Sequence, residues 1–361
     1  MPQVYTHPRD LHRWIADRGI TRLMLVGGST AKRPPLCDWL AAIPCPVVWF
    51  DGIRPNPLYE DICRGVELFR REGCDGILAA GGGSAMDTAK AIKLWCRLDP
   101  AAGLYLHQPM TDTGVPLGAI PTTAGTGSEA TRYAVLYHEG EKQSVAHESL
   151  VPDGAFLFPE LLYTLPPYQK KATLLDALCQ SIESTWAVKA NGESTAFASA
   201  SIRGILTHMD AYLAGDPAAC GPIQQAAYDS GRAIDVTATT AAHAMGYKLT
   251  TLYGLAHGHA VGLCMRVLWP YVASHTAESV LPGGEAALKA ALHRLTVLFG
   301  AENAAHAARK YAALYDSLAL PTPAIAEAEL SVLAASVNVE RLKNNPVPLS
   351  AETLYALYRA M

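Results

Sequence analysis

The sequence predicts two domains in one chain, an α/β domain with a mainly parallel sheet followed by an all-helical domain. The 361 residues exceed what a single hydrophobic core usually organises. In the first part, short apolar runs end at glycine or proline turns and alternate with helical patterns, an order typical of parallel sheets. After about Pro159 the strand-like runs stop and long helical patterns follow. The predicted domains are therefore residues 1–157 and 158–361.

Four apolar runs are the predicted strands of the first domain: Leu23–Val26, Val47–Phe50, Gly76–Ala80 and Val115–Ile120. Between them, Leu58–Glu72 is expected to be helical, because Ile62, Val66 and Phe69 recur at helical spacing. The turns that follow parallel strands meet at the carboxyl edge of the sheet, so a ligand site is expected there. The predicted helices of the second domain are Thr173–Val188, Ser194–Leu213, Pro222–Met245, Gly258–Val272, Gly284–Phe299 and Ala304–Leu318.

Composition argues against several classes of protein. Half of the residues are hydrophobic and 17% are charged, so the chain is not a disordered protein. The net charge is −4 and no long basic run occurs, which argues against a nucleic-acid partner. The eight cysteines form no CxxC pair, so we expect reduced thiols in a cytoplasmic protein. The N-terminus has no apolar signal core, and no apolar stretch is long enough to span a membrane.

Two turns in the first domain have the composition of a dinucleotide site. GGGSAMDTAK (Gly81–Lys90) follows a predicted strand and opens a predicted helix, where glycines let the backbone approach a pyrophosphate. It is not a GxGxxG fingerprint, so a plain strand–helix turn capped by Ser84 is the alternative. PTTAGTGSEAT (Pro121–Thr131) follows another predicted strand and offers hydroxyl groups for nucleotide contacts, although a simple Ser/Thr-rich loop would have the same composition.

Three residues of the second domain are candidate metal ligands: Asp176, His243 and His257. Asp176 lies four residues before Gln180, hence on the same helix face, in the apolar segment LLDALCQSIES. A carboxylate there costs free energy unless it is paired or coordinated. Taken singly, a salt-bridged Asp and two satisfied core histidines explain these residues. All three are expected near helix ends in small, apolar surroundings, and this combination favours a metal site.

GGGSxxDxAK, followed some forty residues later by PTTAGTGSE, resembles the iron-containing (group III) alcohol dehydrogenase family, and the resemblance covers nearly the whole chain. It implies a Rossmann-like α/β domain and an all-α metal-binding domain, the architecture that this family shares with dehydroquinate synthase. It also implies that Gly82, Gly83 and Ser84 bind the cofactor diphosphate. Further residues that match cofactor-pocket positions of the family are Asp87, Thr122, Thr123 and Thr126.

The resemblance also carries the metal to Asp176, His243 and His257. The family's commonest site has a further His four residues after the Asp, where this chain has Gln180, a weaker oxygen ligand. Gln180 is then expected to bind the metal, to orient a bound water, or to do neither. Two His and one carboxylate with an open position fit Fe²⁺ or Zn²⁺.

Proton transfer has two candidate residues in the same segment. Tyr247 stands where many family members have a His that is often described as a proton relay. His259 lies two residues after His257 and is the second candidate, with a structural role as the alternative.

The first predicted strand ends in LMLVGGSTAKR, and this segment bears on the choice of dinucleotide. NAD-preferring relatives place an Asp after that strand to accept a hydrogen bond from the ribose 2′-OH, about where Gly28 stands here. Without that carboxylate, Ser29 and its neighbours Thr30, Lys32 and Arg33 are able to donate hydrogen bonds to a 2′-phosphate. NADP(H) is therefore favoured, with NAD(H) and an ordinary solvated loop as the alternative.

Four further segments resemble a narrower group, the phosphonoacetaldehyde reductases: TRYAVLYHEGEKQSV, LYTLPPYQKKATLLDALCQSIES, TTAAHAMGYKLTTLYGLAHGHAV and SVNVERLKNNPVPLS. A phosphonate dianion needs cations around it. The favoured candidates are Arg132, Lys142 and Lys171. Lys170, Lys248 and Arg266 are further candidates, and ordinary surface cations are the alternative for all six.

The sequence thus predicts a metal-dependent NAD(P)H-linked aldehyde reductase or alcohol dehydrogenase acting at a cleft between its domains, with phosphonoacetaldehyde as the expected substrate and 2-hydroxyethylphosphonate as the product. A neutral primary alcohol or a sulfonated aldehyde is the alternative substrate. A lyase related to dehydroquinate synthase is disfavoured, because that family carries a Glu at the position of Asp176. A non-catalytic dinucleotide sensor would need no metal ligands. We expect a small-molecule substrate and a homo-oligomer, such as a dimer.

Overall fold

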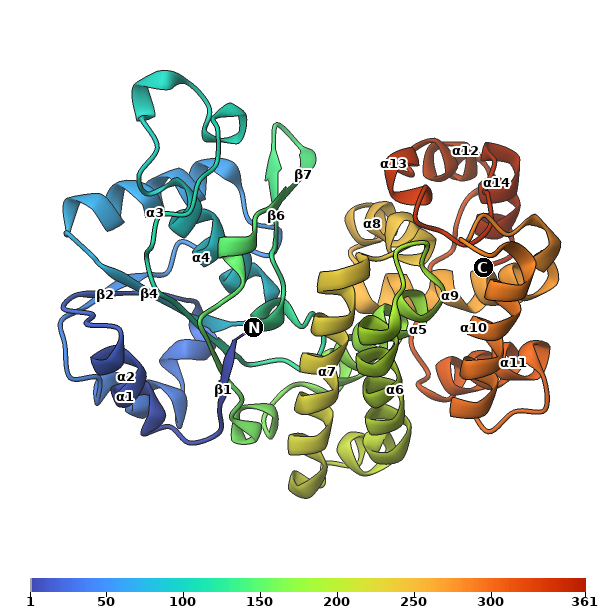
Figure 1. Cartoon of the computed structure of the whole chain (residues 1–361), viewed down its shortest axis with the longest axis horizontal. Helices are drawn as coiled ribbons and strands as arrows, with labels where there is room; N and C mark the ends of the chain where they lie inside the picture. The colour runs from blue at the N-terminus through green and yellow to red at the C-terminus, as the bar shows by residue number, and fades with distance from the viewer. Residues whose placement is uncertain (1) are drawn as a thin grey trace. The chain divides into compact units, whose positions relative to one another are not determined.

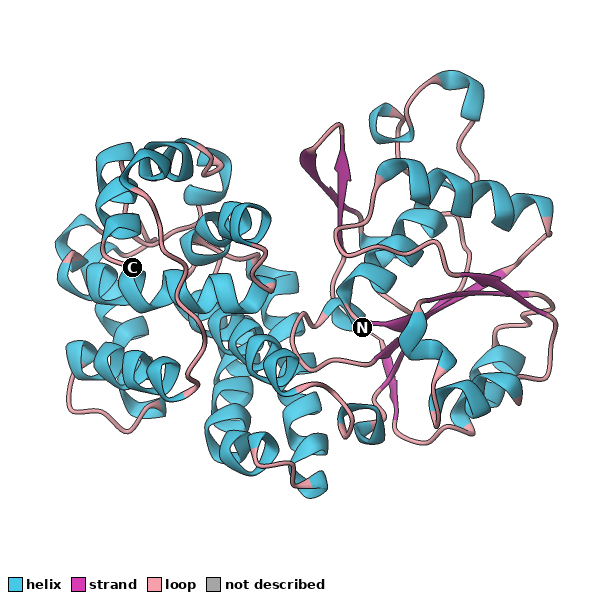
Figure 2. Ribbon diagram, turned by 180° about the vertical axis from the view of Figure 1, so that it is seen from behind, coloured by secondary structure: helices cyan, strands magenta, loops and turns pink. Residues whose placement is uncertain are grey.

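The computed structural model describes residues 2–361, and the chain divides into two compact units, residues 1–164 and 165–361. All β-strands of the described residues lie in the first unit, as the magenta arrows in Figure 2 show. The second unit is built from helices joined by loops (Figure 1). The predicted fold class, a parallel-sheet α/β part followed by a helical part, is confirmed.

A six-stranded parallel sheet forms the centre of the first unit, in the strand order β1-β8-β5-β4-β2-β3. Its strands are β1 (Gln3–Tyr5), β2 (Leu23–Gly27), β3 (Val47–Phe50), β4 (Gly76–Gly81), β5 (Leu117–Pro121) and β8 (Gly154–Phe156). The four predicted strands correspond to β2, β3, β4 and β5. Strands β1 and β8 are only three residues long, too short for a periodic pattern, and they are defined by their pairing with each other.

Helices cover both faces of this sheet (Figure 1): α1 (Asp10–Asp17), α2 (Leu36–Ala41), α3 (Tyr59–Arg71) and α4 (Gly83–Trp95). Successive side chains of a strand point to opposite faces. Leu23 and Leu25 of β2 pack with buried residues of α1 and α2. Met24 and Val26 pack with buried residues of α3 and α4. Because both faces are covered, the inner strands are continuous apolar runs rather than alternating ones.

An antiparallel hairpin, β6 (Tyr133–His138) and β7 (Glu141–Ala146), forms a second small sheet. These two strands are not among those predicted from the sequence. Their connection is the two-residue turn Glu139-Gly140, in which both φ angles are positive, at 52° and 79°. Such turns match the twist of paired strands. Glu is an uncommon first residue for this turn, which is why the sequence gives only a weak hairpin signal.

The helices of the second unit are α5 (Pro167–Trp186), α6 (Gly192–Leu213), α7 (Pro217–Thr237), α8 (Ala241–Tyr253), α9 (His257–Ser274), α10 (Gly284–Leu298), α11 (Ala304–Ser317), α12 (Glu327–Ala335), α13 (Val339–Leu342) and α14 (Ala351–Arg359). Helix α5 packs against α6, α7 and α9, and every residue from Leu174 to Trp186 is buried. Polar side chains in that stretch therefore need partners inside the protein.

The single helix predicted over Pro222–Met245 is wrong. The chain leaves the helix at residues 238–240, where Ala238 has a φ of 57°, and α8 starts after this break. The hydroxyl groups on either side of the break bond to α5: Thr237 to Ser184, and Thr240 to Glu183. These hydrogen bonds to α5 stabilise the break although the apolar periodicity continues through it. As a result, His243 lies in the first turn of α8.

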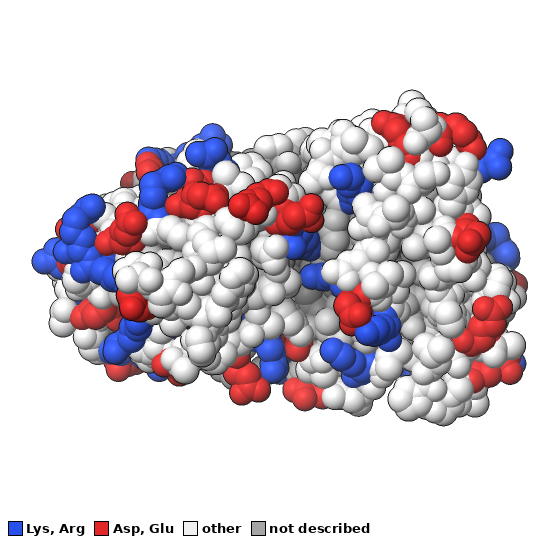
Figure 3. All heavy atoms as spheres, turned by 90° about the horizontal axis from the view of Figure 1, so that it is seen from above, with Lys and Arg blue, Asp and Glu red and all other residues white. Residues whose placement is uncertain are grey.

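Charge is mixed on the surface. On the face shown in Figure 3, Lys and Arg side chains are interspersed with Asp and Glu, in keeping with the small net charge of −4. Within residues 2–361, no helix combines the length and apolar character that crossing a membrane requires.

Candidate metal centre and cofactor turns

Asp176, His243 and His257 come together in the second unit, from α5, α8 and α9. One donor atom from each lies within 4.8 Å of the other two. The Nε2 atom of His243 lies 3.3 Å from Oδ1 of Asp176, and both residues are buried, whereas His257 is half-buried. One carboxylate oxygen and two imidazole nitrogens are a donor set that suits Fe²⁺ or Zn²⁺. The residues present therefore fit a divalent metal.

Gly258 lets His257 approach Asp176. A Cβ atom at Gly258 would lie 2.0 Å from the carbonyl oxygen of Ala172 and 2.7 Å from Cβ of Asp176. No side chain fits at those distances, so only glycine allows the first turn of α9 to rest on α5 at this point. The His-Gly pair thus has a packing reason as well as a chemical one.

Glu183 holds the other side of the His243 ring and is not among the site residues predicted from the sequence. Its Oε2 hydrogen-bonds Nδ1 of His243, while its Oε1 accepts the Thr240 hydroxyl at 2.7 Å and the backbone N–H of Ala242 at 2.8 Å. The Glu183 side chain is fully buried. It lies seven residues after Asp176, two helical turns along the same face of α5, and this spacing was the available signal. A carboxylate in this position fixes the ring orientation of a metal-binding His.

These charges set the protonation of the cluster. Burial lowers the pKa of His243, but Glu183 and Asp176 outweigh it and raise that pKa to about 9. Burial raises the pKa of Asp176, and hydrogen bonds and the charges of the two histidines lower it overall. Burial likewise raises the pKa of Glu183, and the charge of His243 outweighs it. Both carboxylates are therefore ionised at neutral pH, which favours a cation between the donor atoms.

The two predicted cofactor turns lie side by side at the carboxyl edge of the sheet. Strands β4 and β5 are neighbours, with Gly81 opposite Pro121. A Cβ atom at Gly82 would lie 3.6 Å from the side chain of Thr123, and one at Gly83 would lie 3.0 Å from Thr126. Gly82 precedes α4 in extended conformation, and Gly83 and Ser84 begin that helix. Helix N–H groups without intrahelical partners are thus available to an anion at this edge.

Lys90 ties the second turn to α4. The residue is 1% exposed, and its ammonium group donates to three backbone carbonyls, of Ser128, Thr131 and Tyr133, at 2.6 to 2.9 Å. The hydroxyl groups of Ser128 and Thr131 lie 3.0 Å away. A buried cation is tolerated only with such complete hydrogen bonding. Lys90 therefore fixes the backbone of the turn after its last glycine.

The first strand–turn segment borders the same edge. The strand order reverses between β2 and β4, since β3 pairs on one side of β2 and β4 on the other. Gly28 and Ser29 follow β2 directly, and Ser29 is exposed. Open α/β sheets bind ligands beyond such a reversal. Of the neighbouring cations, Lys32 forms an ion pair with Asp51 at 2.6 Å.

Comparison with known proteins assigns the family. The pattern described as "Iron-containing alcohol dehydrogenase" matches residues 5–159, and that of "Fe-containing alcohol dehydrogenase family, C-terminal" matches residues 170–361. The chain belongs to the iron-containing alcohol dehydrogenase family. It is therefore an oxidoreductase, and the family binds NAD(P) and a divalent metal. The phosphonoacetaldehyde reductase of Streptomyces viridochromogenes is 32% identical over 91% of this chain and 87% of its own length.

Solved structures of iron-containing alcohol dehydrogenases have the same fold. The Thermococcus thioreducens enzyme superposes with a TM-score of 0.89 at 23% identity, covering 99% of this chain and 97% of its own. The Thermotoga maritima enzyme superposes with a TM-score of 0.82 at 27% identity, with the same coverage.

Gln180, the predicted fourth member of the metal site, lies on α5 four residues after Asp176. The side chain is buried, hydrogen-bonds to Asp176 and lies with Oε1 2.8 Å from the Ser230 hydroxyl of α7. The structure thus brings Gln180 to the ligand cluster, in contact with a ligand carboxylate. Its part in binding the metal stays a prediction.

The two candidates for proton transfer have different surroundings. The ring of Tyr247 stacks on that of His257, with centroids 5.1 Å apart and planes 8° apart, and its hydroxyl accepts a hydrogen bond from Arg341. His259 is fully buried, and its Nδ1 lies 3.1 Å from the hydroxyl of Tyr168. Of these two candidates, Tyr247 is the one that contacts the ring of a candidate metal ligand, His257.

The predicted substrate cations are distributed over both units. In the first unit, Arg132 forms an ion pair with Glu148 at 3.3 Å, and the charge of Lys142 acts on Asp87. Burial raises the pKa of Asp87 to about 6 in spite of Lys90 and Lys142. In the second unit, Lys171 donates to the carbonyl oxygen of Leu318 at 2.7 Å.

Other predicted residues are engaged as follows. Arg266 pairs with Asp316 at 3.1 Å, and Lys170 lies 4.8 Å above the ring of Tyr212. Thr122 continues the sheet by donating its N–H to Gly81. Lys248 is half-buried on α8.

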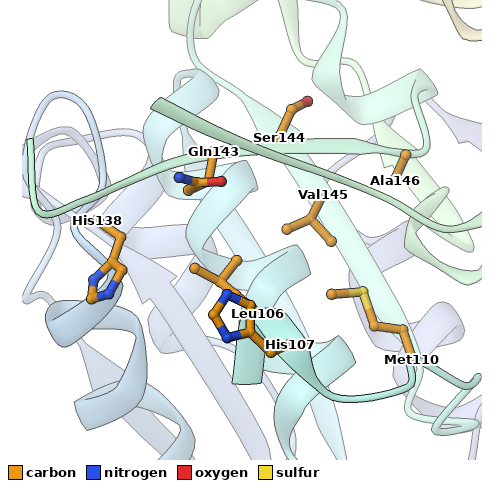
Figure 4. Close-up of a pocket in the computed structure, with 8 residues that line it drawn as sticks. All are labelled: Leu106, His107, Met110, His138, Gln143, Ser144, Val145 and Ala146. Atoms are coloured by element: carbon orange, nitrogen blue, oxygen red, sulfur yellow. The ribbon is translucent and has the colours of Figure 1, made fainter. Parts of the chain in front are cut away.

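A separate hollow of about 230 Å³ lies in the first unit, between residues 106–110 and the hairpin (Figure 4). Its polar lining includes His107, His138 and Gln143. None of the predicted site residues lines it. His138 is bound to Glu60 at 3.2 Å and contacts the ring of Tyr59, so it serves the packing of the hairpin on α3.

Proposed function

We propose that this iron-containing alcohol dehydrogenase uses NADP(H) to reduce phosphonoacetaldehyde to 2-hydroxyethylphosphonate. The reductase class rests on the family and on the Asp176–His243–His257 cluster. The observation that carries the substrate is the 32% identity to a phosphonoacetaldehyde reductase over 91% of the chain.

Asp176, His243 and His257 hold the metal in this proposal, with Gln180 beside Asp176. A divalent ion bound there supplies a Lewis acid for the carbonyl oxygen of the substrate. Glu183 keeps Nδ1 of His243 occupied, so that Nε2 faces Asp176. Burial of Asp176 and His243 keeps water from competing with these contacts.

The cofactor turns hold the dinucleotide. Gly82, Gly83 and Ser84 offer the N-terminal N–H groups of α4 to the diphosphate. Bound NADPH supplies the hydride for the carbonyl carbon. The remaining residues proposed to line its pocket are Gly28, Ser29, Asp87, Thr122, Thr123 and Thr126. The absence of a carboxylate at Gly28 supports NADP(H) over NAD(H).

Reduction of the aldehyde also needs one proton on the oxygen, and Tyr247 is the proposed donor. Its hydroxyl accepts a hydrogen bond from Arg341 at 3.1 Å, and its ring lies flat against that of His257, a candidate metal ligand. His259, bound to Tyr168, is the second candidate in a longer relay.

An aldehyde panel tests the proposal. The purified protein, loaded with Fe²⁺ or Zn²⁺, is assayed with phosphonoacetaldehyde, sulfoacetaldehyde and butanal, each with NADPH and NADH. We expect the highest kcat/KM with phosphonoacetaldehyde and NADPH, and no reduction after chelation. A preference for butanal would refute the anionic substrate, and a preference for sulfoacetaldehyde would replace the phosphonate by a sulfonate.

We further propose that the protein is a cytoplasmic homodimer. The eight cysteines are all free, as a reducing compartment requires. Light scattering of the purified protein measures the oligomeric state.

A further inference from the structure

A cation from α13 reaches the candidate metal centre through Tyr247. We propose that Arg341, held by Tyr247, forms an anion subsite beside His257 that binds the phosphonate group of the substrate. The identity of the anion rests on the proposed function, and the subsite itself rests on contacts within the second unit. Arg341 is not among the cations that the sequence analysis selects.

The contacts form a continuous chain from the ligand cluster to the guanidinium. Nη1 of Arg341 donates to the Tyr247 hydroxyl at 3.1 Å, and the guanidinium carbon lies 5.2 Å from the Tyr247 ring centre. The Tyr247 ring lies flat against His257. Because an aromatic ring has few rotatable bonds, this stacking holds the hydroxyl and hence the guanidinium in place.

The charge of Arg341 is not neutralised by the protein. Within residues 2–361, no carboxylate forms an ion pair with Arg341, and its neighbour Glu340 is bound to Lys343 at 2.6 Å. Arg341 is nonetheless half-buried. A partly desolvated cation without a counter-ion is unfavourable by itself and favours an anionic ligand.

The guanidinium group also has the right hydrogen-bonding capacity. It carries five N–H donors, and the one bond to Tyr247 leaves the others for a ligand. Phosphonate oxygens accept two parallel hydrogen bonds from such a group. The other predicted cations of this unit that have described contacts are engaged elsewhere, since Lys171 binds Leu318 and Arg266 binds Asp316.

The first test compares Arg341→Met and Arg341→Lys with Lys343→Met, which removes an exposed cation two residues away. The readout is the ratio of kcat/KM for phosphonoacetaldehyde to kcat/KM for butanal. We expect Arg341→Met to lower this ratio about 10- to 100-fold, the usual loss for a charged hydrogen bond. Arg341→Lys should recover part of it, and Lys343→Met should leave it unchanged. An equal loss for both aldehydes would overturn the subsite and leave Arg341 as support for Tyr247 alone.

The second test does not depend on the substrate. Calorimetric titration of the metal-loaded protein with methylphosphonate measures anion affinity directly. We expect Arg341→Met to weaken binding at least about tenfold, and Lys343→Met to bind as the unchanged protein does. If phosphonoacetaldehyde is not reduced but methylphosphonate binding depends on Arg341, the proposed substrate fails and the subsite stands. If phosphonoacetaldehyde is reduced and neither readout depends on Arg341, the subsite fails and the proposed function stands.

Discussion

His257 is the half-buried member of the ligand cluster, and the ring of Tyr247 stacks on it. His257→Ala removes one of three donor atoms. We expect metal content near zero and a fall in turnover of at least about 100-fold, more than the loss of an outer-shell partner usually costs. Elemental analysis and NADPH oxidation measure both effects. His293→Ala, exposed on α10, is the matched control. Normal turnover in His257→Ala would contradict the ligand assignment.

Glu183 acts on the metal through His243. Glu183→Gln keeps the size of the side chain but removes the charge that orients Nδ1. We expect metal affinity to fall about 10- to 100-fold, as for other outer-shell carboxylates. Competition with a chelator of known affinity measures the change, and circular dichroism checks that α8 remains folded. Glu193→Gln, on the exposed first turn of α6, is the control. An unaltered metal affinity would show that Glu183 only caps α8.

The packing of helix α9 on helix α5 depends on the absence of a side chain at Gly258. In Gly258→Ala the new methyl group meets the Ala172 carbonyl oxygen, so α9 must move away from Asp176. We expect a loss of about 1–3 kcal/mol in unfolding free energy, together with weaker metal binding. Gly192→Ala, where nothing lies within 4 Å, should change stability by less than about 1 kcal/mol. Urea unfolding of the two variants makes the comparison. If Gly258→Ala and Gly192→Ala changed the unfolding free energy equally, helices α5 and α9 would be able to move apart at little cost.

The conformation of the turn between β5 and β6 depends on the hydrogen bonds of Lys90. Lys90→Met leaves the carbonyls of Ser128, Thr131 and Tyr133 without their donor, and the turn loses its attachment to α4. We expect the Kd for NADPH to rise about tenfold, equal to about 1.4 kcal/mol. Fluorescence titration measures this value. Lys289→Met, which changes an exposed side chain of α10, serves as control. If the folded variant bound NADPH with unchanged affinity, the turn between β5 and β6 would not be part of the cofactor site.

For the whole molecule, each compact unit has its own proposed ligand. Metal at about 100 times its Kd stabilises the unit that binds it by about 2.7 kcal/mol. Hydrogen exchange should therefore accelerate in α5, α8 and α9 on chelation and remain constant in β4 and α4. Addition of NADPH should slow exchange in residues 81–90 and 121–131. Faster exchange throughout both units on chelation would contradict separate ligand sites.

Local patterns along the chain were enough to predict the fold class and most of the elements, and two motifs pointed to the family. Strands β2, β4 and β5 are apolar because both faces of the sheet are covered there, and the long helices of the second unit keep their periodicity. Asp176, His243 and His257 stood out as polar residues in apolar helical surroundings, and the resemblance to the family's ligand set carried the metal to them. These properties are local, so they can be read along the chain.

Features that depend on contacts between distant segments became visible only in the folded chain. The break at residues 238–240 arises because Thr237 and Thr240 bond to α5, and periodicity alone predicted one helix there. Glu183 and Arg341 gain their roles from His243 and Tyr247, which lie 60 and 94 residues away in the chain. The hydrogen bonds by which Lys90 holds the second turn could not be predicted either, because its acceptors follow about forty residues later in the sequence. A side chain's partner is set by packing, and packing brings together residues whose spacing in the sequence carries no pattern.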